Sequence, residues 1–227
     1  MNSYWKPLQA SFVKVENLET AKKMKNYMKG QFEYYGIKQP ERKQLEKEFY
    51  LQNPIPNYNQ MEALVLDAWK QPHREWKYVA LSFFEKYKKQ WKADEINLIE
   101  KLIQTDSWWD TVDMLATKYS GFLLKKYPDL VPDKPNEWIQ SNDLWLKRSA
   151  LLFQLHYKSK TDFPLLKAYI YECLPTKEFF LQKAIGWTLR QYSKIEPAIV
   201  VDFIEKNPLP PLSMREGLKW VRKENLY

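Results

Sequence analysis

Three residue types are scarce in this sequence, and each shortage excludes a class of protein. Only 5 of the 227 residues are glycine, too few for the turns of a many-stranded sheet or for a phosphate-binding loop. Cys173 is the single cysteine, so no disulfide can form within the chain, and we expect a reducing compartment. With His73 and His156 as the two histidines, neither a Cys/His zinc site nor an iron–sulfur cluster can be assembled. The sequence therefore predicts no metal and no cofactor.

Long apolar runs are missing as well. No stretch reaches the roughly 18 consecutive apolar residues that a membrane span requires, and the N-terminal residues do not resemble a signal peptide. We therefore expect a cytoplasmic protein that does not bind a membrane. The charged residues are unbalanced, with 36 Lys and Arg against 28 Asp and Glu, which gives a net charge of +8. This excess favours a polyanionic partner, and nucleic acid is the first candidate.

Helix-forming patterns fill most of the chain. Apolar residues recur at spacings of three and four, and prolines stand where one such segment ends or the next begins. No stretch is long or biased enough in composition to separate domains, so we expect one all-helical domain over residues 1–227. The expected helices are Leu8–Val15, Ala21–Phe32, Pro40–Leu51, Met61–Trp69, Arg74–Tyr87, Ala93–Ile103, Trp108–Lys118, Phe122–Tyr127, Glu137–Ile139, Leu144–Tyr157, Asp162–Cys173, Glu178–Tyr192, Pro197–Glu205 and Ser213–Lys223.

A weak internal repeat organises these helices. Tyr78, Asp113, Arg148 and Lys183 follow one another at a constant interval of 35 residues, and Arg215 comes 32 residues later. Such a period is typical of stacked helical units, which place equivalent side chains in one column along a shared surface. The Trp, Leu-Gly and Tyr pattern of tetratricopeptide units is missing, so a degenerate HEAT-like solenoid with a concave basic face fits better.

Helix geometry brings two tryptophans and one carboxylate toward this surface. Lys183, Trp187 and Arg190 occupy one face of the helix expected at Glu178–Tyr192. Trp109 and Asp113 are four residues apart and should project together. We expect the neighbouring stripe of Trp108, Val112 and Leu115 to pack into the core instead.

Ordinary structural roles compete with these functional ones. Asp113 could be a surface carboxylate that pairs with Arg148 of the next unit. Both histidines are interpreted as ordinary helix residues. Five of the ten tryptophans are expected to serve packing alone, namely Trp5, Trp69, Trp91, Trp138 and Trp145.

Several segments resemble the AlkD-type DNA alkylation repair glycosylases. The strongest likeness lies in Ser107–Asp113, with further blocks at Trp145–Lys158 and Lys177–Arg190, and it extends over essentially the whole chain. The resemblance implies a right-handed superhelical solenoid of HEAT-like repeats that cradles duplex DNA. It also implies hydrolysis of the N-glycosidic bond of cationic alkylpurines such as 3-methyladenine and 7-methylguanine. No obligate protein partner is implied, and the expected location is at the nucleoid.

The resemblance also implies roles for individual residues. Trp109, Asp113 and Trp187 match the catalytic cleft of the family, and Arg148 matches an arginine that supports the aspartate and the DNA backbone. Asp113 is expected to stabilise positive charge that develops on the deoxyribose.

Candidate DNA-binding residues come from both ends of the chain. Tyr27, Lys29 and Arg42 lie in N-terminal segments that resemble the family, and the cations expected to hold phosphates nearer the C-terminus are Lys183, Arg190 and Arg215. A repeat protein that binds DNA without catalysis and a protein-binding scaffold are the alternative interpretations.

Overall fold

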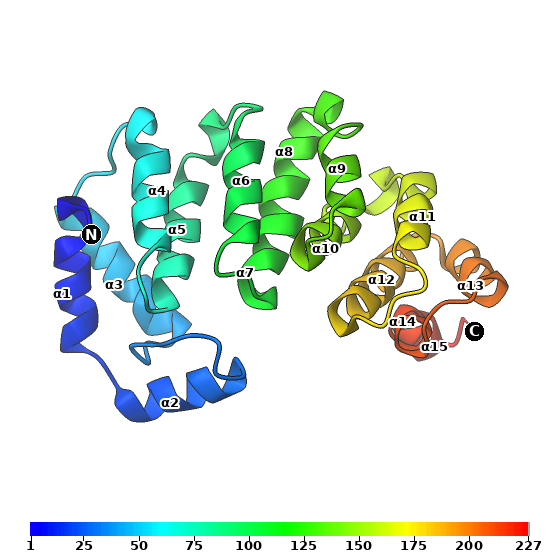
Figure 1. The fold of residues 1–227 in the computed structure, drawn as a ribbon, viewed down its shortest axis with the longest axis horizontal. Coiled ribbons are helices and arrows are strands. Elements are labelled where there is room, and N and C mark those ends of the chain that lie inside the picture. The colour runs from blue at the N-terminus through cyan, green and yellow to red at the C-terminus, as the bar shows by residue number, and fades with distance from the viewer. Residues whose placement is uncertain (227) are drawn as a thin grey trace. The chain divides into compact units, whose positions relative to one another are not determined.

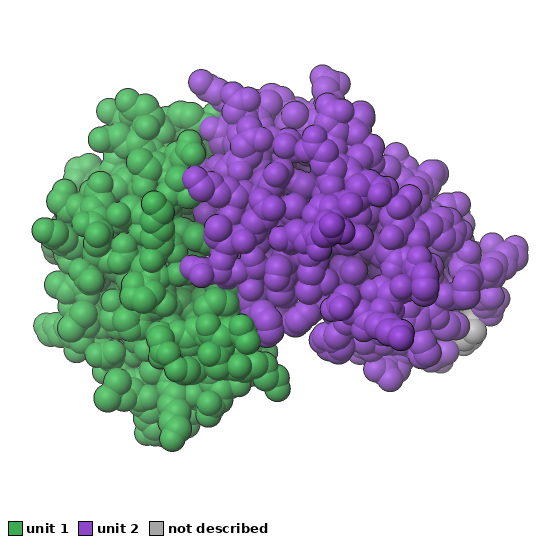
Figure 2. Space-filling model, in the orientation of Figure 1, with its two compact units in different colours: residues 1–91 green, residues 92–227 purple. Residues whose placement is uncertain are grey.

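Helices supply nearly all of the regular structure in the computed structural model, which describes residues 1–226. Within these residues the extended pairing amounts to one isolated bridge, between Glu33 and His73. The chain divides into two units, residues 1–91 and residues 92–227, which are coloured separately in Figure 2. An all-helical structure was expected from the sequence and is confirmed, whereas the single domain over residues 1–227 stays a prediction.

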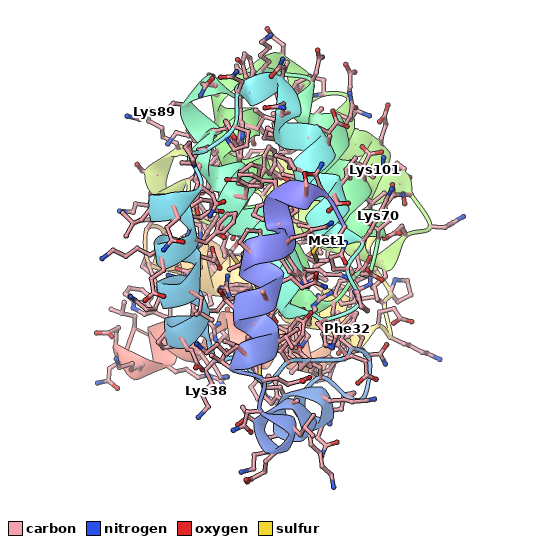
Figure 3. The ribbon with its side chains drawn as sticks, turned by 90° about the vertical axis from the view of Figure 1, so that its left-hand side faces the viewer. Met1, Phe32, Lys38, Lys70, Lys89 and Lys101 are labelled. Atoms are coloured by element: carbon pink, nitrogen blue, oxygen red, sulfur yellow. The ribbon has the colours of Figure 1, made fainter. Side chains whose placement is uncertain are left out.

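The first unit is built around a core of aromatic side chains. Trp5, Phe12, Trp76 and Phe83 are completely or almost completely buried, and the ring centroids of Trp5 and Phe83 lie 5.0 Å apart. Helix α1 packs against α3, as Figure 3 shows, and α4 packs against α5. The helices of this unit are α1 (Lys6–Lys14), α2 (Leu18–Tyr27), α3 (Gln39–Gln52), α4 (Met61–Trp69) and α5 (Glu75–Lys86), with short 3-10 turns η1 (Ser3–Trp5), η2 (Tyr58–Gln60) and η3 (Lys88–Gln90).

A buried carboxylate fastens the segment between α2 and α3 onto α5. Glu75 accepts hydrogen bonds from the backbone N–H groups of Tyr35, Gly36 and Ile37, at 3.0 to 3.2 Å. Gly36 has a φ of 86°, and a Cβ there would lie 2.2 Å from the carbonyl oxygen of Asn17. Glycine is therefore required where this segment passes close to the start of α2.

The second unit is a succession of helices in which α10, α12 and α14 form a series of packed neighbours (Figure 1). A π-helix, η4, joins α7 to α8 without a break, and α10 packs against η4 on one side and against α12 on the other. The helices are α6 (Glu95–Gln104), α7 (Trp109–Met114), η4 (Leu115–Ser120), α8 (Gly121–Lys126), α9 (Lys134–Gln140), α10 (Leu144–Leu152), α11 (Phe163–Glu172), α12 (Phe179–Tyr192), α13 (Pro197–Lys206), α14 (Pro211–Gly217) and α15 (Lys219–Lys223), with 3-10 turns η5 (Pro128–Leu130) and η6 (Lys158–Lys160).

Hydrogen bonds within this unit recur at separations close to the predicted repeat. The Tyr157 hydroxyl donates to the carbonyl of Gly121, 36 residues earlier, and the Tyr169 hydroxyl donates to Asn136, 33 residues earlier. Arg148 donates to Asp113 across 35 residues. These separations lie close to the interval of 35 seen in the sequence, as hydrogen bonds between stacked helical units would.

Several local predictions were wrong. His73 lies in the bridge before α5, and His156 lies in a turn, so neither is a helix residue. The helix expected over 144–157 ends at Leu152, and residues 153–156 form a turn before η6.

Candidate active site

The four residues predicted to be catalytic meet at one cavity of the second unit. Its volume is about 290 Å³, and α7, α10, α12 and α14 all contribute side chains to it. The lining residues are Trp109, Asp113, Arg148, Phe179, Phe180, Lys183, Trp187, Arg190 and Glu216. The four residues that the sequence grouped therefore lie together, their catalytic role stays a prediction, and the two phenylalanines and Glu216 were not foreseen in this lining.

An ion pair with two parallel hydrogen bonds fixes Asp113. Arg148 donates from Nε to Oδ1 at 2.7 Å and from Nη2 to Oδ2 at 2.9 Å, the bidentate geometry of a strong arginine–carboxylate pair. Its Nη1 donates to the backbone carbonyl of Phe180 on α12. The Arg148 side chain is 5% exposed and that of Asp113 is 19% exposed. Asp113 therefore faces the cavity, while Arg148 has little surface left for the DNA backbone contact that the resemblance implied.

The surroundings of Asp113 act on its pKa in opposite directions. Burial raises this pKa most strongly, the hydrogen bonds and charge of Arg148 lower it, and the nearby charge of Asp110 raises it. The net result is a pKa above the ordinary value for an aspartate. Asp113 is thus a poorly solvated carboxylate that depends on Arg148 to remain charged.

The backbone around Asp113 is irregular in a way the sequence did not reveal. Helix α7 continues into the π-helix η4 directly after Met114, where an unbroken α-helix to Lys118 was expected. The Thr117 hydroxyl donates to the backbone carbonyl of Asp113 at 2.6 Å. Short π-helical segments inside α-helices are frequent at functional sites, because they alter the direction of the side chains beside them.

Two tryptophans line the cavity with Asp113. Trp109 is the first residue of α7 and lies one turn before Asp113, so both side chains project from the same face. Trp187 comes from the middle of α12, between Lys183 and Arg190 on one helix face. Both rings are partly buried, in contrast to Trp5, Trp69, Trp91 and Trp138, which are buried as expected for packing residues.

A second aromatic group supports the cavity wall, and it corrects the prediction made for Trp108. Trp108 was expected to be a helical residue that packs into the protein core. It precedes α7 instead, in an extended conformation, and is only partly buried. Its ring centroid lies 5.8 Å from that of Trp145 and 5.4 Å from that of Phe180. Trp145, expected to serve packing, is partly buried and packs against the other two rings of this group. These rings stabilise the start of α12, whose Phe180 carbonyl accepts a hydrogen bond from Arg148.

Of the predicted DNA-binding cations of this unit, two lie at the cavity and one does not. Lys183 and Arg190 line it, and both form salt bridges with Glu216, at 3.1 and 3.0 Å. Arg215 is exposed on α14 but does not line the cavity. Glu216 directly follows Arg215 in the sequence, yet nothing there showed that it would form ion pairs with the cations of α12.

The candidates of the first unit differ in accessibility. Tyr27 is 69% exposed, and Lys29 is exposed with a φ of 57°. Arg42, in contrast, is 6% exposed; it donates to Glu46, and its guanidinium lies 5.2 Å from the centroid of the Tyr78 ring. The position of Arg42 thus contradicts a role as a surface contact for phosphate, because its guanidinium is buried against Glu46 of α3 and the Tyr78 ring of α5.

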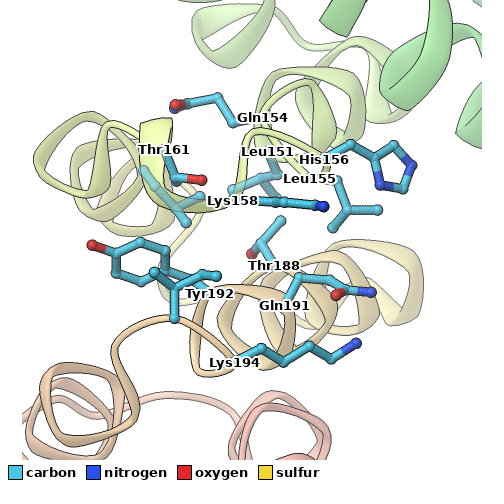
Figure 4. Close-up of a pocket in the computed structure, with 12 residues that line it drawn as sticks. Leu151, Gln154, Leu155, His156, Lys158, Thr161, Thr188, Gln191, Tyr192 and Lys194 are labelled. Atoms are coloured by element: carbon cyan, nitrogen blue, oxygen red, sulfur yellow. The ribbon is translucent and has the colours of Figure 1, made fainter.

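A second cavity of the same unit lies beside the ends of α10 and α12 and contains none of the predicted site residues. Its volume is about 380 Å³. Figure 4 shows His156, Lys158 and Lys194 around it, together with polar side chains from Thr161 and Gln191. Burial, together with the charge of Lys118, lowers the pKa of His156, which favours the neutral ring. Because no carboxylate lines this cavity, we do not assign the predicted chemistry to it.

The part of the chain that the structure describes contains neither a cluster of metal ligands nor a membrane-spanning helix. Among the described residues, no group of histidine, cysteine, aspartate and glutamate side chains is arranged to hold a metal ion. In the same part of the chain, no helix is both long enough and apolar enough to cross a membrane.

Known proteins resemble this chain over most of its length. Residues 8–221 match the family described as DNA alkylation repair enzyme. A solved structure titled "Predicted DNA alkylation repair enzyme from Enterococcus faecalis" is similar with a TM-score of 0.85 and 34% sequence identity, over 92% of this chain and 97% of that chain. A comparison with curated proteins finds no match.

Proposed function

This chain belongs to the family of DNA alkylation repair enzymes, and from that membership we propose that it is an AlkD-type DNA glycosylase. The proposed reaction is hydrolysis of the N-glycosidic bond of cationic alkylated purines, 3-methyladenine and 7-methylguanine, in duplex DNA. The main support for this proposal is the position of Asp113. Asp113, a partly desolvated carboxylate held by Arg148, faces a cavity that is also lined by Trp109 and Trp187.

Asp113 suits the charge that develops when such a bond breaks. As the base departs, positive charge moves onto the deoxyribose, and a fixed carboxylate nearby stabilises this oxocarbenium-like transition state. The stabilisation is large because the carboxylate is mostly shielded from water, where a charge interacts more strongly than in bulk solvent. The same carboxylate can accept a hydrogen bond from the water that attacks the sugar.

The remaining lining residues fit the same reaction. The faces of the Trp109 and Trp187 rings attract a cation and would flank the sugar. Arg148 acts as a positioning residue, because its two hydrogen bonds fix the direction of the Asp113 carboxylate. Lys183 and Arg190 carry positive charge at the rim for the adjoining phosphates.

No proton donor is needed for this class of substrate. A purine alkylated at N3 or N7 already carries a positive charge and leaves as a neutral base. The second carboxyl group of the lining, Glu216, has a pKa of about 2 and is ionised at neutral pH, so it cannot act as a general acid. The lining thus favours lesions that are already charged, and we propose that neutral, stable lesions such as uracil are not released.

The mode of DNA engagement follows from the family resemblance. We propose that the protein contacts the lesion through the sugar-phosphate backbone, as a HEAT-like solenoid with a basic concave face would allow. A deep pocket for an extruded base is then unnecessary. The recurring hydrogen bonds of the second unit support the repeat, and the right-handed superhelix stays a prediction.

The reaction can be tested with purified protein and duplex DNA that carries 7-methylguanine. We expect free base in the supernatant, and Asp113→Asn should slow its release tenfold or more, since one lost electrostatic stabiliser typically costs a few kcal/mol. Chromatography of the released bases measures the rate, and a parallel duplex with uracil should yield none.

Asp110→Asn is the matched control for this experiment. Asp110 lies on the same helix and carries the same charge, but it does not line the cavity. Its substitution should leave the rate at neutral pH within about threefold. If Asp113→Asn released base as fast as the unmodified protein, Asp113 would have no part in the mechanism. Salt-sensitive duplex binding without base release would instead indicate a non-catalytic DNA-binding protein.

A further inference from the structure

Glu216 is a buried carboxylate that gathers three cations at the edge of the candidate active site. Its Oε1 lies 3.1 Å from Nζ of Lys183 and 2.8 Å from Nζ of Lys219, and its Oε2 lies 3.0 Å from Nη1 of Arg190. The side chain of Glu216 is 6% exposed, whereas those of the three cations are 38%, 52% and 28% exposed, respectively. The negative charge is thus enclosed, and the positive charges remain accessible.

The charges of this cluster do not cancel. Three cations face one carboxylate, so two positive charges remain uncompensated. Burial acts to raise the pKa of Glu216, but the hydrogen bonds and charges of Lys219 and Lys183 outweigh it and bring the pKa to about 2. Glu216 is therefore ionised at neutral pH, and the cluster presents a net charge of about +2 to solvent.

The packing of α12 against α14 makes this arrangement possible. Lys183 and Arg190 are seven residues apart on one face of α12, and Glu216 lies on α14. At Gly186 the two helices are so close that an added Cβ would lie 2.5 Å from the Cβ of Glu216. The glycine brings the carboxylate within reach of both cations of α12, which also line the cavity that Asp113 faces.

When lysine and arginine side chains are already held in place, less conformational entropy is lost as they bind a ligand. Immobilising a free lysine or arginine side chain costs more conformational entropy than immobilising most other side chains. A single anion that holds three cations restricts them before a ligand arrives, and each cation retains donors that the shared carboxylate does not use.

We propose that Glu216 is a positioning residue that holds Lys183, Arg190 and Lys219 as a preformed site for phosphodiester groups of the DNA backbone. The site lies at the cavity that Asp113 faces, so a bound phosphate would place the adjoining sugar within reach of that carboxylate. This assignment rests on the proposed function for its substrate, nucleic acid, and it adds Glu216 and Lys219 to the residues that would engage it.

The test compares Glu216→Gln with the unmodified chain in two measurements. One is binding of an undamaged duplex at several salt concentrations, and the other is the single-turnover release of 7-methylguanine. We expect Glu216→Gln to weaken duplex binding at least threefold, although it adds positive charge. The slope of log K against log salt should become shallower by about 1, because about one phosphate contact is lost. Base release should slow about tenfold.

Asp202→Asn is the matched control, because it changes the net charge by the same amount at an exposed ion pair with Lys206 that does not line the cavity. It should change neither measurement by more than about twofold. A Glu216→Gln chain that binds the duplex as tightly as the unmodified chain, or more tightly, with an unchanged or steeper salt dependence, would overturn the proposal. The cations would then act by charge alone.

A double substitution separates positioning from a purely structural role. If Glu216 acts through the cations, Glu216→Gln should change the salt slope less in a Lys183→Met background than in the unmodified chain. Equal changes in both backgrounds would indicate that Glu216 only joins α12 to α14. If the unmodified chain releases no base, the glycosylase proposal fails, while the binding measurements still decide whether Glu216 positions the phosphate-binding cations.

Discussion

At the scale of single residues, the function proposed here depends on how Asp113 keeps its charge while it is shielded from water. Burial alone would favour the neutral acid, and the two hydrogen bonds from Arg148 favour the carboxylate. Arg42 and Glu46 show the same combination in the first unit, where burial is the largest influence and raises the pKa of Glu46 against the charge of Arg42. Both carboxylates line a cavity, but the Asp113 side chain is 19% exposed and that of Glu46 is 7% exposed, and the cavity beside Glu46 has no tryptophan in its wall.

The raised pKa of Asp113 predicts how the rate of base release depends on pH. The proposed reaction needs the ionised carboxylate, so the rate of base release should fall as the pH is lowered through the pKa of Asp113. Because that pKa is raised, the fall should occur above the value of about 3.9 that is typical of aspartate. A pH profile of 7-methylguanine release, corrected for spontaneous depurination, measures it.

Asp110 provides an internal check of this assignment. The charge of Asp110 contributes to the raised pKa of Asp113, so Asp110→Asn should move the fall in rate to lower pH. A profile that stays in place, or that moves to higher pH, would show that a different group controls the rate.

At the scale of helices, the site depends on close packing at a few positions. The π-helix η4 begins two residues after Asp113, and Gly186 allows α12 and α14 to approach closely enough for Glu216 to reach Lys183. The rings of Trp108, Trp145 and Phe180 pack where α7, α10 and α12 begin. The site therefore depends on the spacing of these helices as well as on the identity of the residues that line it.

Gly186→Ala should reveal the importance of this spacing. The new methyl group would lie 2.5 Å from the Cβ of Glu216 and 2.9 Å from the carbonyl oxygen of Ser213, so α12 and α14 must separate. We expect urea unfolding to show a loss of about 1–3 kcal/mol from overpacking, although alanine favours a helix by about 1 kcal/mol over glycine. Asn97→Ala, at an exposed position of α6, should show no loss. A Gly186→Ala chain of unchanged or higher stability would contradict the close packing described here.

At the scale of the whole chain, each unit has its own buried core and its own buried carboxylate. Glu75 in the first unit accepts three backbone hydrogen bonds from residues 35–37, and Glu216 in the second unit accepts from three side chains. The first arrangement serves folding, since its partners are backbone groups that the interior must satisfy. The second presents its partners to solvent, which is why we assign function to it.

Glu75→Ala tests the structural role in the complete chain. The substitution leaves three backbone N–H groups without their acceptor, and each buried group of this kind costs about 1–3 kcal/mol. We expect the free energy of unfolding to fall by about 3 kcal/mol or more in a urea titration. Glu62→Ala, at an exposed position of α4, should change it by less than about 0.5 kcal/mol. Equal midpoints for both variants would show that the segment at residues 35–37 is held by other contacts.

The sequence by itself determined the helical class, most helix positions and the facing pair of Asp113 and Arg148. These features follow from periodicities that are local or regular: 3.6 residues within a helix and 35 residues between units. Only the tertiary structure decided that Arg42 is buried, that Trp108 leaves the core and that Glu216 collects three cations. Those outcomes depend on the distances at which separate helices pack, such as the close approach at Gly186, and no spacing along the sequence encodes them.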